Sequence, residues 1–346
     1  MEKLSRTPIY VRDDFRRDGL AATFKISMNL YQKYLESFPS GTRINIGYPS
    51  ICKQEYLACK EILKLRRTEV ELSPVGHARQ YDLKIMEELL RGHSNVSANI
   101  WIPLSDSACS SILNSTPEDV LKAAMDSIKY WKRLTDIPLD IALTDTTNIE
   151  EYLDNRIADW YSSLMSAGFR SIILCDTQGV GNIERLSSVF KQIGDFEWHP
   201  HDDGGFAKTT SELAVKFGAS HIGTSFLKCS ERMNMLDPRS VIEDERFNEL
   251  LDHIVGDFKS EVTEIIKLRD TIYNKNTFIT GTHHKLWGKT GADYTLLFGV
   301  TTDSQLFKLI TGKSISSECI AELKDKYLYS DQNSYMTKEK LLKLDF

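Results

Sequence analysis

The chain has 346 residues, of which 41% are hydrophobic and 27% charged, with a formal net charge of −6. This composition excludes a disordered or collagen-like chain, and the length suffices for one large α/β barrel or two ordinary domains. No apolar run approaches the ~20 residues of a transmembrane helix, and the N-terminus lacks the apolar core of a secretory signal. The sequence also has no long basic run that could follow nucleic-acid phosphates. We therefore expect a soluble, cytoplasmic protein that binds neither membrane nor nucleic acid.

Short apolar or β-branched runs alternate with longer amphipathic stretches through the first two thirds of the chain. The pattern predicts eight strands, over residues 9–15, 43–48, 69–75, 96–102, 139–144, 171–176, 196–201 and 221–226. Helical spacing fills the gaps between them. The run Thr116-Pro117-Glu118-Asp119 predicts a capped helix start with proline at its first position, and Gly168 and Gly218 fall where helices should end.

Eight repeats of strand and helix are typical of a closed parallel (β/α)₈ barrel, the TIM barrel, over residues 1–236. An open doubly wound sheet is the competing fold, but it favours a Gly-x-Gly-x-x-Gly turn after the first strand, and the sequence has none there. From Asp237 onward the chain becomes helix-rich and charged. We therefore expect a helical C-terminal subdomain over residues 237–346.

The cysteines give no sign of a disulfide framework or of a thiolate zinc site. They are scattered, without a Cys-x-x-Cys pair, at positions 52, 59, 109, 175, 229 and 319. Scattered reduced thiols are typical of a cytoplasmic protein.

Polar clusters follow three predicted strands, at the end of the barrel where catalytic groups gather. They are residues 16–19 after the first strand, 199–205 at the end of the seventh and 230–234 after the eighth. His199 and His201 are two residues apart, so their imidazoles face the same side of the strand. In a closed barrel the first strand neighbours the eighth, and we expect Asp18 to reach the same point.

Two imidazoles and a carboxylate with open positions suit a catalytic divalent cation. The oxygen-rich surroundings, with Asp202, Asp203 and Asn234, leave Mn, Mg, Co and Zn open. The alternative is a chance His-x-His pair whose rings are solvated or hydrogen-bonded in a loop. We favour the cation because the pair ends the seventh strand, opposite Arg-Asp-Gly at the first.

In these motifs the chain resembles the DRE-TIM metallolyases, the family of isopropylmalate, homocitrate and citramalate synthases and of hydroxymethylglutaryl-CoA lyase. Residues 13–19 match the family's Asp-x-Thr-Leu-Arg-Asp-Gly, and residues 199–205 match His-x-His-Asn-Asp-x-Gly. Further likeness lies in IGYP at 46–49, CDTQG at 175–179, GT at 223–224, ER at 231–232 and GTHHK at 281–285. The resemblance implies a short form without the regulatory domain of the long synthases.

The resemblance also implies roles for single residues. The implied metal ligands are Asp18, His199, His201 and Asn234. Arg17 would stabilise the developing alkoxide, and Thr224 would hold the carboxylate of a 2-oxo acid. His283 and Glu231 would move protons. The residues alone also fit an ordinary strand threonine, a helix-capping glutamate and a solvated turn histidine.

Several positions depart from the family pattern. Met235 occupies the column of the synthases' metal-binding asparagine, with Asn234 one residue earlier. Thr144 replaces an acidic residue after the fifth strand, and Ala108 stands where a histidine is expected. These changes bear on the substrate and on the level of activity.

We expect a divalent-metal-dependent acyltransferase that condenses acetyl-CoA with a 2-oxo acid in a Claisen reaction and releases CoA. We also expect a homodimer in which the C-terminal subdomain reaches the partner's active site. One alternative is a carbon–carbon lyase, like hydroxymethylglutaryl-CoA lyase or a 2-oxo acid aldolase; that lyase relies on a cysteine in a glycine-rich loop, and Cys229 lies nearby without flanking glycines. Another is a barrel that binds a metabolite without turnover, which Thr144 and Met235 suggest.

Overall fold

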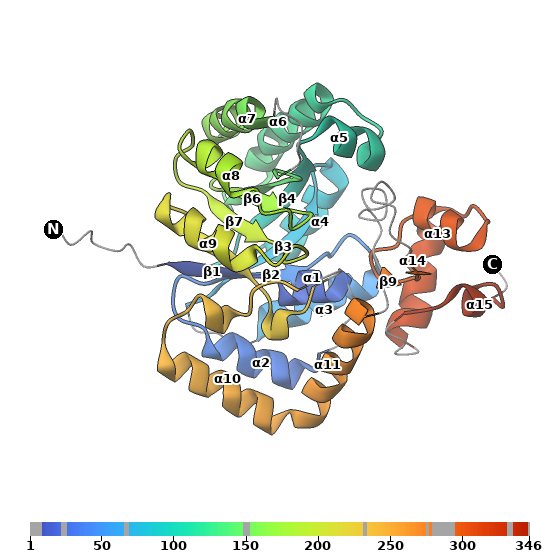
Figure 1. The fold of residues 1–346 in the computed structure, drawn as a ribbon. Coiled ribbons are helices and arrows are strands. Elements are labelled where there is room, and N and C mark those ends of the chain that lie inside the picture. Colours follow the sequence, from blue (N-terminus) through green and yellow to red (C-terminus); the bar gives the residue numbers. More distant parts are fainter. Residues whose placement is uncertain are drawn as a thin grey trace.

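The computed structural model describes residues 9–21, 26–65, 69–147, 153–230, 234–274, 277–278, 295–330 and 335–344. Eight parallel strands form a closed barrel in chain order, with β1 paired to both β2 and β8 (Figure 1). They are β1 (Tyr10–Asp13), β2 (Arg43–Gly47), β3 (Glu71–His77), β4 (Ala98–Pro103), β5 (Leu139–Thr144), β6 (Ile172–Asp176), β7 (Glu197–Pro200) and β8 (His221–Thr224). The expected (β/α)₈ barrel is confirmed.

Helices follow the strands around the outside of the barrel. They are α1 (Phe15–Ala21), α2 (Met28–Ser37), α3 (Lys53–Lys64), α4 (Gln80–Leu90), α5 (Asp106–Leu113), α6 (Pro117–Leu134), α7 (Leu153–Ala167), α8 (Ile183–Phe190) and α9 (Ala207–Lys216). The Thr116 hydroxyl caps α6 by accepting the Asp119 amide. Gly168 and Gly218 follow α7 and α9 with φ of 99° and 93°, a left-handed conformation that favours glycine.

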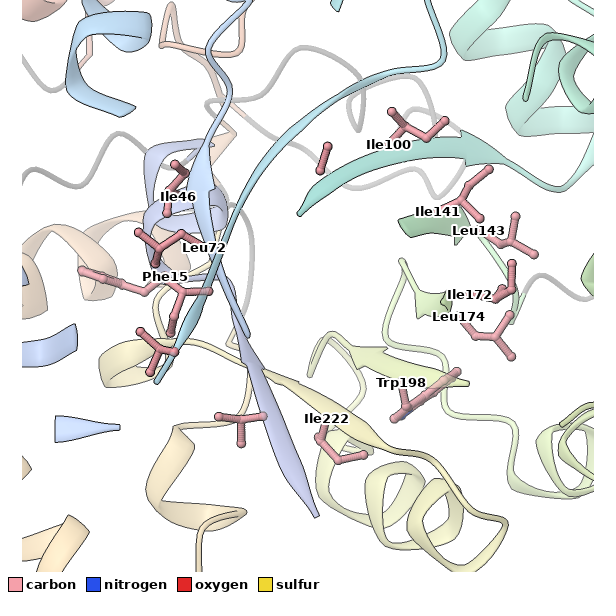
Figure 2. Close-up of a cluster of buried hydrophobic side chains, with 14 of the residues drawn as sticks. Phe15, Ile46, Leu72, Ile100, Ile141, Leu143, Ile172, Leu174, Trp198 and Ile222 are labelled. Carbon is pink, nitrogen blue, oxygen red and sulfur yellow. The ribbon is translucent and has the colours of Figure 1, made fainter. Parts of the chain in front are cut away.

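Most apolar side chains of the strands point outward, into one buried cluster shared with the helices, and a smaller apolar cluster lies inside the barrel. Figure 2 shows part of this cluster, formed by Phe15, Ile46, Leu72, Ile100, Ile141, Leu143, Ile172, Leu174, Trp198 and Ile222. Side chains alternate along a strand, so the residues between these positions face the inside of the barrel. Many of those are polar or charged.

Ion pairs between side chains at the amino-terminal ends of the strands occupy that end of the barrel interior. Arg12 is 1% exposed, and its guanidinium donates to Asp140 Oδ2 and to Glu197 Oε2, each at 2.6 Å. Arg170 donates to Asp140 and, at 2.6 Å, to Glu71. The buried Arg12 and the half-buried Arg170 each face two carboxylates, which is the condition under which buried charges are tolerated.

The chain after the barrel is helical, as expected. Its elements are η1 (Phe226–Lys228), η2 (Pro238–Ser240), α10 (Glu245–Asp257), α11 (Lys259–Asn274), β9 (Thr277–Phe278), β10 (Thr295–Leu296), α13 (Ser304–Thr311), α14 (Ser317–Leu323), η3 (Lys324–Ser330) and α15 (Lys338–Leu341). Helices α10 and α11 lie near α2, and their apolar residues join the barrel cluster (Figure 1). Residues from 298 to 341 form a separate apolar cluster. The division at 236/237 stays a prediction.

Two further features are the lengths of the apolar helices and the state of the cysteines. Among the described residues, no helix combines the length and apolar character that crossing a membrane requires. All six cysteines are free thiols, and five of them are buried.

Candidate metal centre

The structure brings three of the predicted metal ligands together at the carboxyl ends of the strands. Ligand atoms of Asp18, His199 and His201 all lie within 4.8 Å of one another, and all three residues are buried. The two Nε2 atoms are 3.3 Å apart, and His199 Nε2 is 3.6 Å from Asp18 Oδ2. Asp18 comes from α1, directly after β1, and the histidines come from the end of β7. That the cluster binds a cation stays a prediction.

Neighbouring groups orient both imidazoles toward this common point. His199 Nδ1 lies 3.0 Å from Asp14 Oδ2, and His201 Nδ1 lies 3.3 Å from Ser230 Oγ. We assign the ring protons to the two Nδ1 atoms, which leaves the two Nε2 lone pairs facing each other and Asp18. A carboxylate behind a ligating histidine is the usual arrangement around protein-bound metals. Burial opposes ionisation of Asp14, but the adjacent His199 and Arg17 outweigh it and hold the pKa of this carboxyl below its usual value.

The cluster has the chemistry of a cation site. Asp18 Oδ2 is fully buried and has no hydrogen-bond partner among the described residues, although its other oxygen accepts Arg17 Nη1. At 3.6 Å the nearest imidazole nitrogen is beyond hydrogen-bond reach. A divalent cation would satisfy this carboxylate oxygen and both imidazole lone pairs at once. His199 and His201 are 7% and 2% exposed, so they are not solvated, and the alternative to a cation site is a hydrogen-bonded histidine pair.

A pocket of about 480 Å³, counted with its open mouth, adjoins the cluster. One side is polar and consists of Asp14, Arg17, Asn45, Thr177, His199 and His201. The lining also contains an apolar cluster of Val75, Trp101, Ala142, Ile173 and Cys175, which pack together with Tyr48, and among them the polar side chains of Asn99 and Thr144. The pocket therefore presents a polar and an apolar half to one ligand.

Arg17 lies on the polar side, beside the candidate metal ligands, as expected. Its guanidinium pairs with Asp18 and lies 5.8 Å from the centre of the Tyr48 ring. The side chain is 19% exposed, so it faces the pocket rather than bulk water.

The structure does not bring Thr224 into the pocket. Its buried hydroxyl donates to Asp13 Oδ2 at 3.2 Å, on the outer face of the strand. The inward position is Gly223, where a Cβ would lie 3.0 Å from the His199 Cα. Because neighbouring residues of a strand face opposite sides, Thr224 points away from the metal ligands. This corrects the expectation that it holds the substrate carboxylate there.

The remaining expected residues divide between the described and the undescribed parts of the chain. Asn234 is half-buried, and its carbonyl accepts the Asp202 amide at 2.8 Å, which places it beside the end of β7. Met235 is fully buried, as suits a packing residue. Glu231 and His283 lie outside the described residues.

Thr144 and Ala108, which depart from the family pattern, both lie among the described residues. The side chain of Thr144 lines the pocket, and its hydroxyl donates to the Ile102 carbonyl at 3.4 Å. Ala108 is fully buried in the first turn of α5, where its amide donates to the Ser105 hydroxyl. Only Thr144 of these two can therefore touch a ligand in this pocket.

Sequence reasoning missed several residues of the pocket. Thr177 follows Cys175 by two residues and so faces the same side, and its hydroxyl accepts the Asp145 amide at 2.8 Å. Asn45 donates to Asp14 from the neighbouring strand. Alternation along the strands was the signal that would have selected Thr177 and Asn45.

His77 is the last residue of β3. Its ring lies 4.7 Å from the Trp101 ring and 5.9 Å from the Tyr48 ring. Desolvation lowers the pKa of His77 to about 3, with further contributions from Arg79 and Arg17. The ring is therefore neutral at ordinary pH and adds no charge beside the apolar half of the pocket.

Comparison with known proteins gives a family model and curated relatives. Residues 33–233, more than half of the chain, match the family model described as HMGL-like. A 2-isopropylmalate synthase of Geobacillus sp. (strain WCH70) is 27% identical over 240 residues, 65% of this chain and 45% of that protein. A 2-isopropylmalate synthase of Clostridium kluyveri is 26% identical over 238 residues, with the same two shares. The chain spans less than half the length of these relatives.

Solved structures share the fold at low sequence identity. The HMG-CoA lyase from Brucella melitensis superposes with a TM-score of 0.60 at 16% identity, over 76% of this chain and 99% of that one. The carboxyl transferase domain of Rhizobium etli pyruvate carboxylase gives 0.57 at 12% identity, over 92% and 53%. At these identities the likeness shows the barrel architecture alone.

Proposed function

The chain belongs to the HMGL-like family, as its motifs indicated, and from this premise we propose that it is a divalent-metal-dependent enzyme that transfers the acyl group of acetyl-CoA to a 2-oxo acid. The observation that carries the proposal is the convergence of Asp18, His199 and His201, with one carboxylate oxygen buried and unpartnered among the described residues. Similarity to 2-isopropylmalate synthases supports acyl transfer as the reaction.

A divalent cation held by Asp18, His199 and His201 would polarise the carbonyl group of a bound 2-oxo acid. The chain's own residues supply the rest of the site. Asp14 orients His199, and Arg17 places a fixed positive charge at the pocket where negative charge develops on oxygen. We propose Thr177, rather than Thr224, as the hydroxyl that meets the substrate carboxylate, because it lines the pocket.

The two halves of the pocket favour a 2-oxo acid with an aliphatic side chain over a 2-oxo dicarboxylic acid. A second carboxylate needs a second cation, because burying an unpaired charge is costly. Among the described residues that line the pocket, the cations are Arg12 and Arg17, and Arg12 already pairs with Asp140 and Glu197. The rest of the lining includes the apolar cluster with Trp101, which begins beside Arg17 at Tyr48 and supplies no further cation.

Carbon–carbon cleavage is the second candidate, because HMG-CoA lyases are among the similar structures. The lyase resemblance requires a reactive cysteine after the eighth strand. Cys229 is fully buried, and burial raises the pKa of its thiol well above the usual value. A thiol in that state is a poor acid and a poor nucleophile, which favours acyl transfer over cleavage.

The proposal is tested by release of free CoA thiol from acetyl-CoA in the presence of Mn²⁺, Mg²⁺, Co²⁺ or Zn²⁺. We expect release with 3-methyl-2-oxobutanoate or pyruvate, much less with 2-oxoglutarate or oxaloacetate, and none with His199→Ala. Cleavage of an acyl-CoA without added 2-oxo acid would support the lyase. No turnover of either kind, with a 2-oxo acid still bound, would favour the non-catalytic barrel.

Assembly and proton transfer also remain proposals. We propose a homodimer in which the C-terminal subdomain reaches the partner's active site. His283 and Glu231, the implied proton-transfer residues, lie outside the described residues. Sedimentation of the purified chain would test the dimer directly.

A further inference from the structure

A segment near the end of the chain completes the first turn of α3. In η3, Asp325 Oδ1 accepts the Gln54 amide at 2.9 Å, and the Tyr329 hydroxyl donates to Glu55 Oε2 at 2.6 Å. Asp325 thus satisfies one of the backbone amides that every helix start leaves free. The two contacts join parts of the chain that are 271 and 274 residues apart in sequence.

Glu55 is fully buried and gathers groups from three parts of the fold. Besides Tyr329, its Oε2 accepts Arg16 Nη2 at 2.7 Å, and its Oε1 accepts the Tyr48 amide at 3.1 Å. Gly47 has φ of +128°, and a Cβ at that position would overlap Oε1. The absence of a side chain at Gly47 is therefore what lets the carboxylate approach the end of β2.

Two of the residues bonded to Glu55, Arg16 and Tyr48, are neighbours of Arg17. Arg16 directly precedes Arg17 and Asp18 in α1, while the Tyr48 ring lies 5.8 Å from the Arg17 guanidinium. Ile51 makes a second connection, because it packs against both the C-terminal apolar cluster and the apolar half of the pocket. In the described part of the C-terminal segment, residues 295–330 and 335–344, these contacts go to residues beside Arg17 and to the pocket wall.

We infer that Glu55 and Tyr329 are positioning residues, through which the C-terminal segment fixes α1 and so places Arg17 and Asp18 at the candidate metal centre. The inference rests on the proposed function, because it concerns the same site. A buried ion pair is weak evidence for stability, but it fixes geometry when each oxygen has a donor, as both oxygens of Glu55 do. Groups behind the metal ligands typically change metal affinity about 10–100-fold when they are removed.

The test compares Tyr329→Phe with Tyr327→Phe, a matched loss of one hydroxyl from the same segment. The Tyr327 ring lies against the Lys326 ammonium, and no contact to Glu55 is seen. We expect Tyr329→Phe to speed hydrogen exchange in α1 and to weaken Mn²⁺ binding several-fold relative to Tyr327→Phe, with a melting temperature lowered by the loss of one hydrogen bond to a buried carboxylate. Glu55→Gln should weaken Mn²⁺ binding about 10-fold or more.

The two readouts separate the inference from the proposed function. If Tyr329→Phe and Tyr327→Phe have the same α1 exchange and the same Mn²⁺ affinity, the positioning role is overturned. If the wild-type chain binds no Mn²⁺, the proposed function fails, while α1 exchange still decides the positioning role. Should Glu55→Gln not fold, the Tyr329→Phe comparison decides alone.

Discussion

Both ends of the barrel interior contain buried charged side chains, but these side chains are paired at one end and incompletely paired at the other. At the strand starts, Arg12 and Arg170 each face two carboxylates at hydrogen-bond distance. At the strand ends, an oxygen of Asp18 is buried without a partner among the described residues and faces two imidazoles. The same strands supply both ends, because β1 carries Arg12 and leads to Asp18. Buried charges that are paired with opposite charges stabilise the fold, whereas the buried oxygen of Asp18 that lacks a hydrogen-bond donor points to a ligand site.

The largest expected effect is a loss of stability when the ion pairs at the amino-terminal ends of the strands, here called the paired end, are broken. Arg12→Met removes the two-pronged partner of Glu197, which keeps only Arg43, and one of the two cations of Asp140, and should lower the free energy of unfolding by up to about 3–5 kcal/mol. Asp18→Asn at the other end removes a charge that has an unsatisfied oxygen, so the metal-free protein should lose no stability of that size. Urea unfolding of both variants checks this, and equal losses would contradict the distinction between the two ends.

Acid should weaken the paired end over a defined pH range. Desolvation raises the pKa of Glu71, but the hydrogen bonds and charge of Arg170 outweigh it and lower that pKa to about 2. The folded pKa is below the unfolded value of 4.5, so this stabilisation is complete above pH ~4.5 and is lost as pH falls toward ~2. The free energy of unfolding should drop by about 3 kcal/mol over that range. In Glu71→Gln this part of the pH dependence should disappear; an unchanged profile would show that Glu71 is not paired as described.

A smaller effect is expected from the carboxylate behind the candidate metal centre. Asp14→Asn removes the charge that orients His199 and should weaken Mn²⁺ binding about 10–100-fold. That is about 1.4–2.7 kcal/mol. Asp126→Asn, on the exposed face of α6, is the control and should bind Mn²⁺ like the wild type. Isothermal titration measures both, and equal affinities would refute the orienting role.

The smallest effect separates the two threonines. Thr177→Val should raise the KM for the 2-oxo acid by a factor corresponding to about 1 kcal/mol, the usual value of one hydrogen bond. Both variants lose an internal hydrogen bond, from the Asp145 amide to Thr177 and from Thr224 to Asp13, so both should lose stability, and only Thr177→Val should also raise KM. Steady-state kinetics with urea unfolding checks the pair, and a KM effect confined to Thr224→Val would reverse the assignment.

Much of the fold and part of the site follow from local patterns in the sequence. Alternation predicted the strands and placed His199 and His201 on one face, and barrel closure brought Asp18 to them. The same alternation places Thr224 on the outer face with Ile222, so the incorrect expectation for Thr224 came from the family resemblance and not from the strand pattern.

Contacts between distant segments lay beyond sequence reasoning altogether. The bonds from Glu55 to Arg16 and Tyr329 join α3 to α1 and η3, and no periodicity links those positions. The same holds for Arg12 and Asp140, which are 128 residues apart and meet only after the barrel closes. Local patterns fix which face a residue occupies, whereas such pairs depend on how whole elements pack.

Titration of the metal-stripped protein with Mn²⁺ tests the central claim most directly. If Asp18, His199 and His201 form a cation site, the wild-type chain binds a single ion, and both His199→Ala and Asp18→Asn lose it while remaining folded. No binding by the wild type, or equal binding by the variants, would contradict the account.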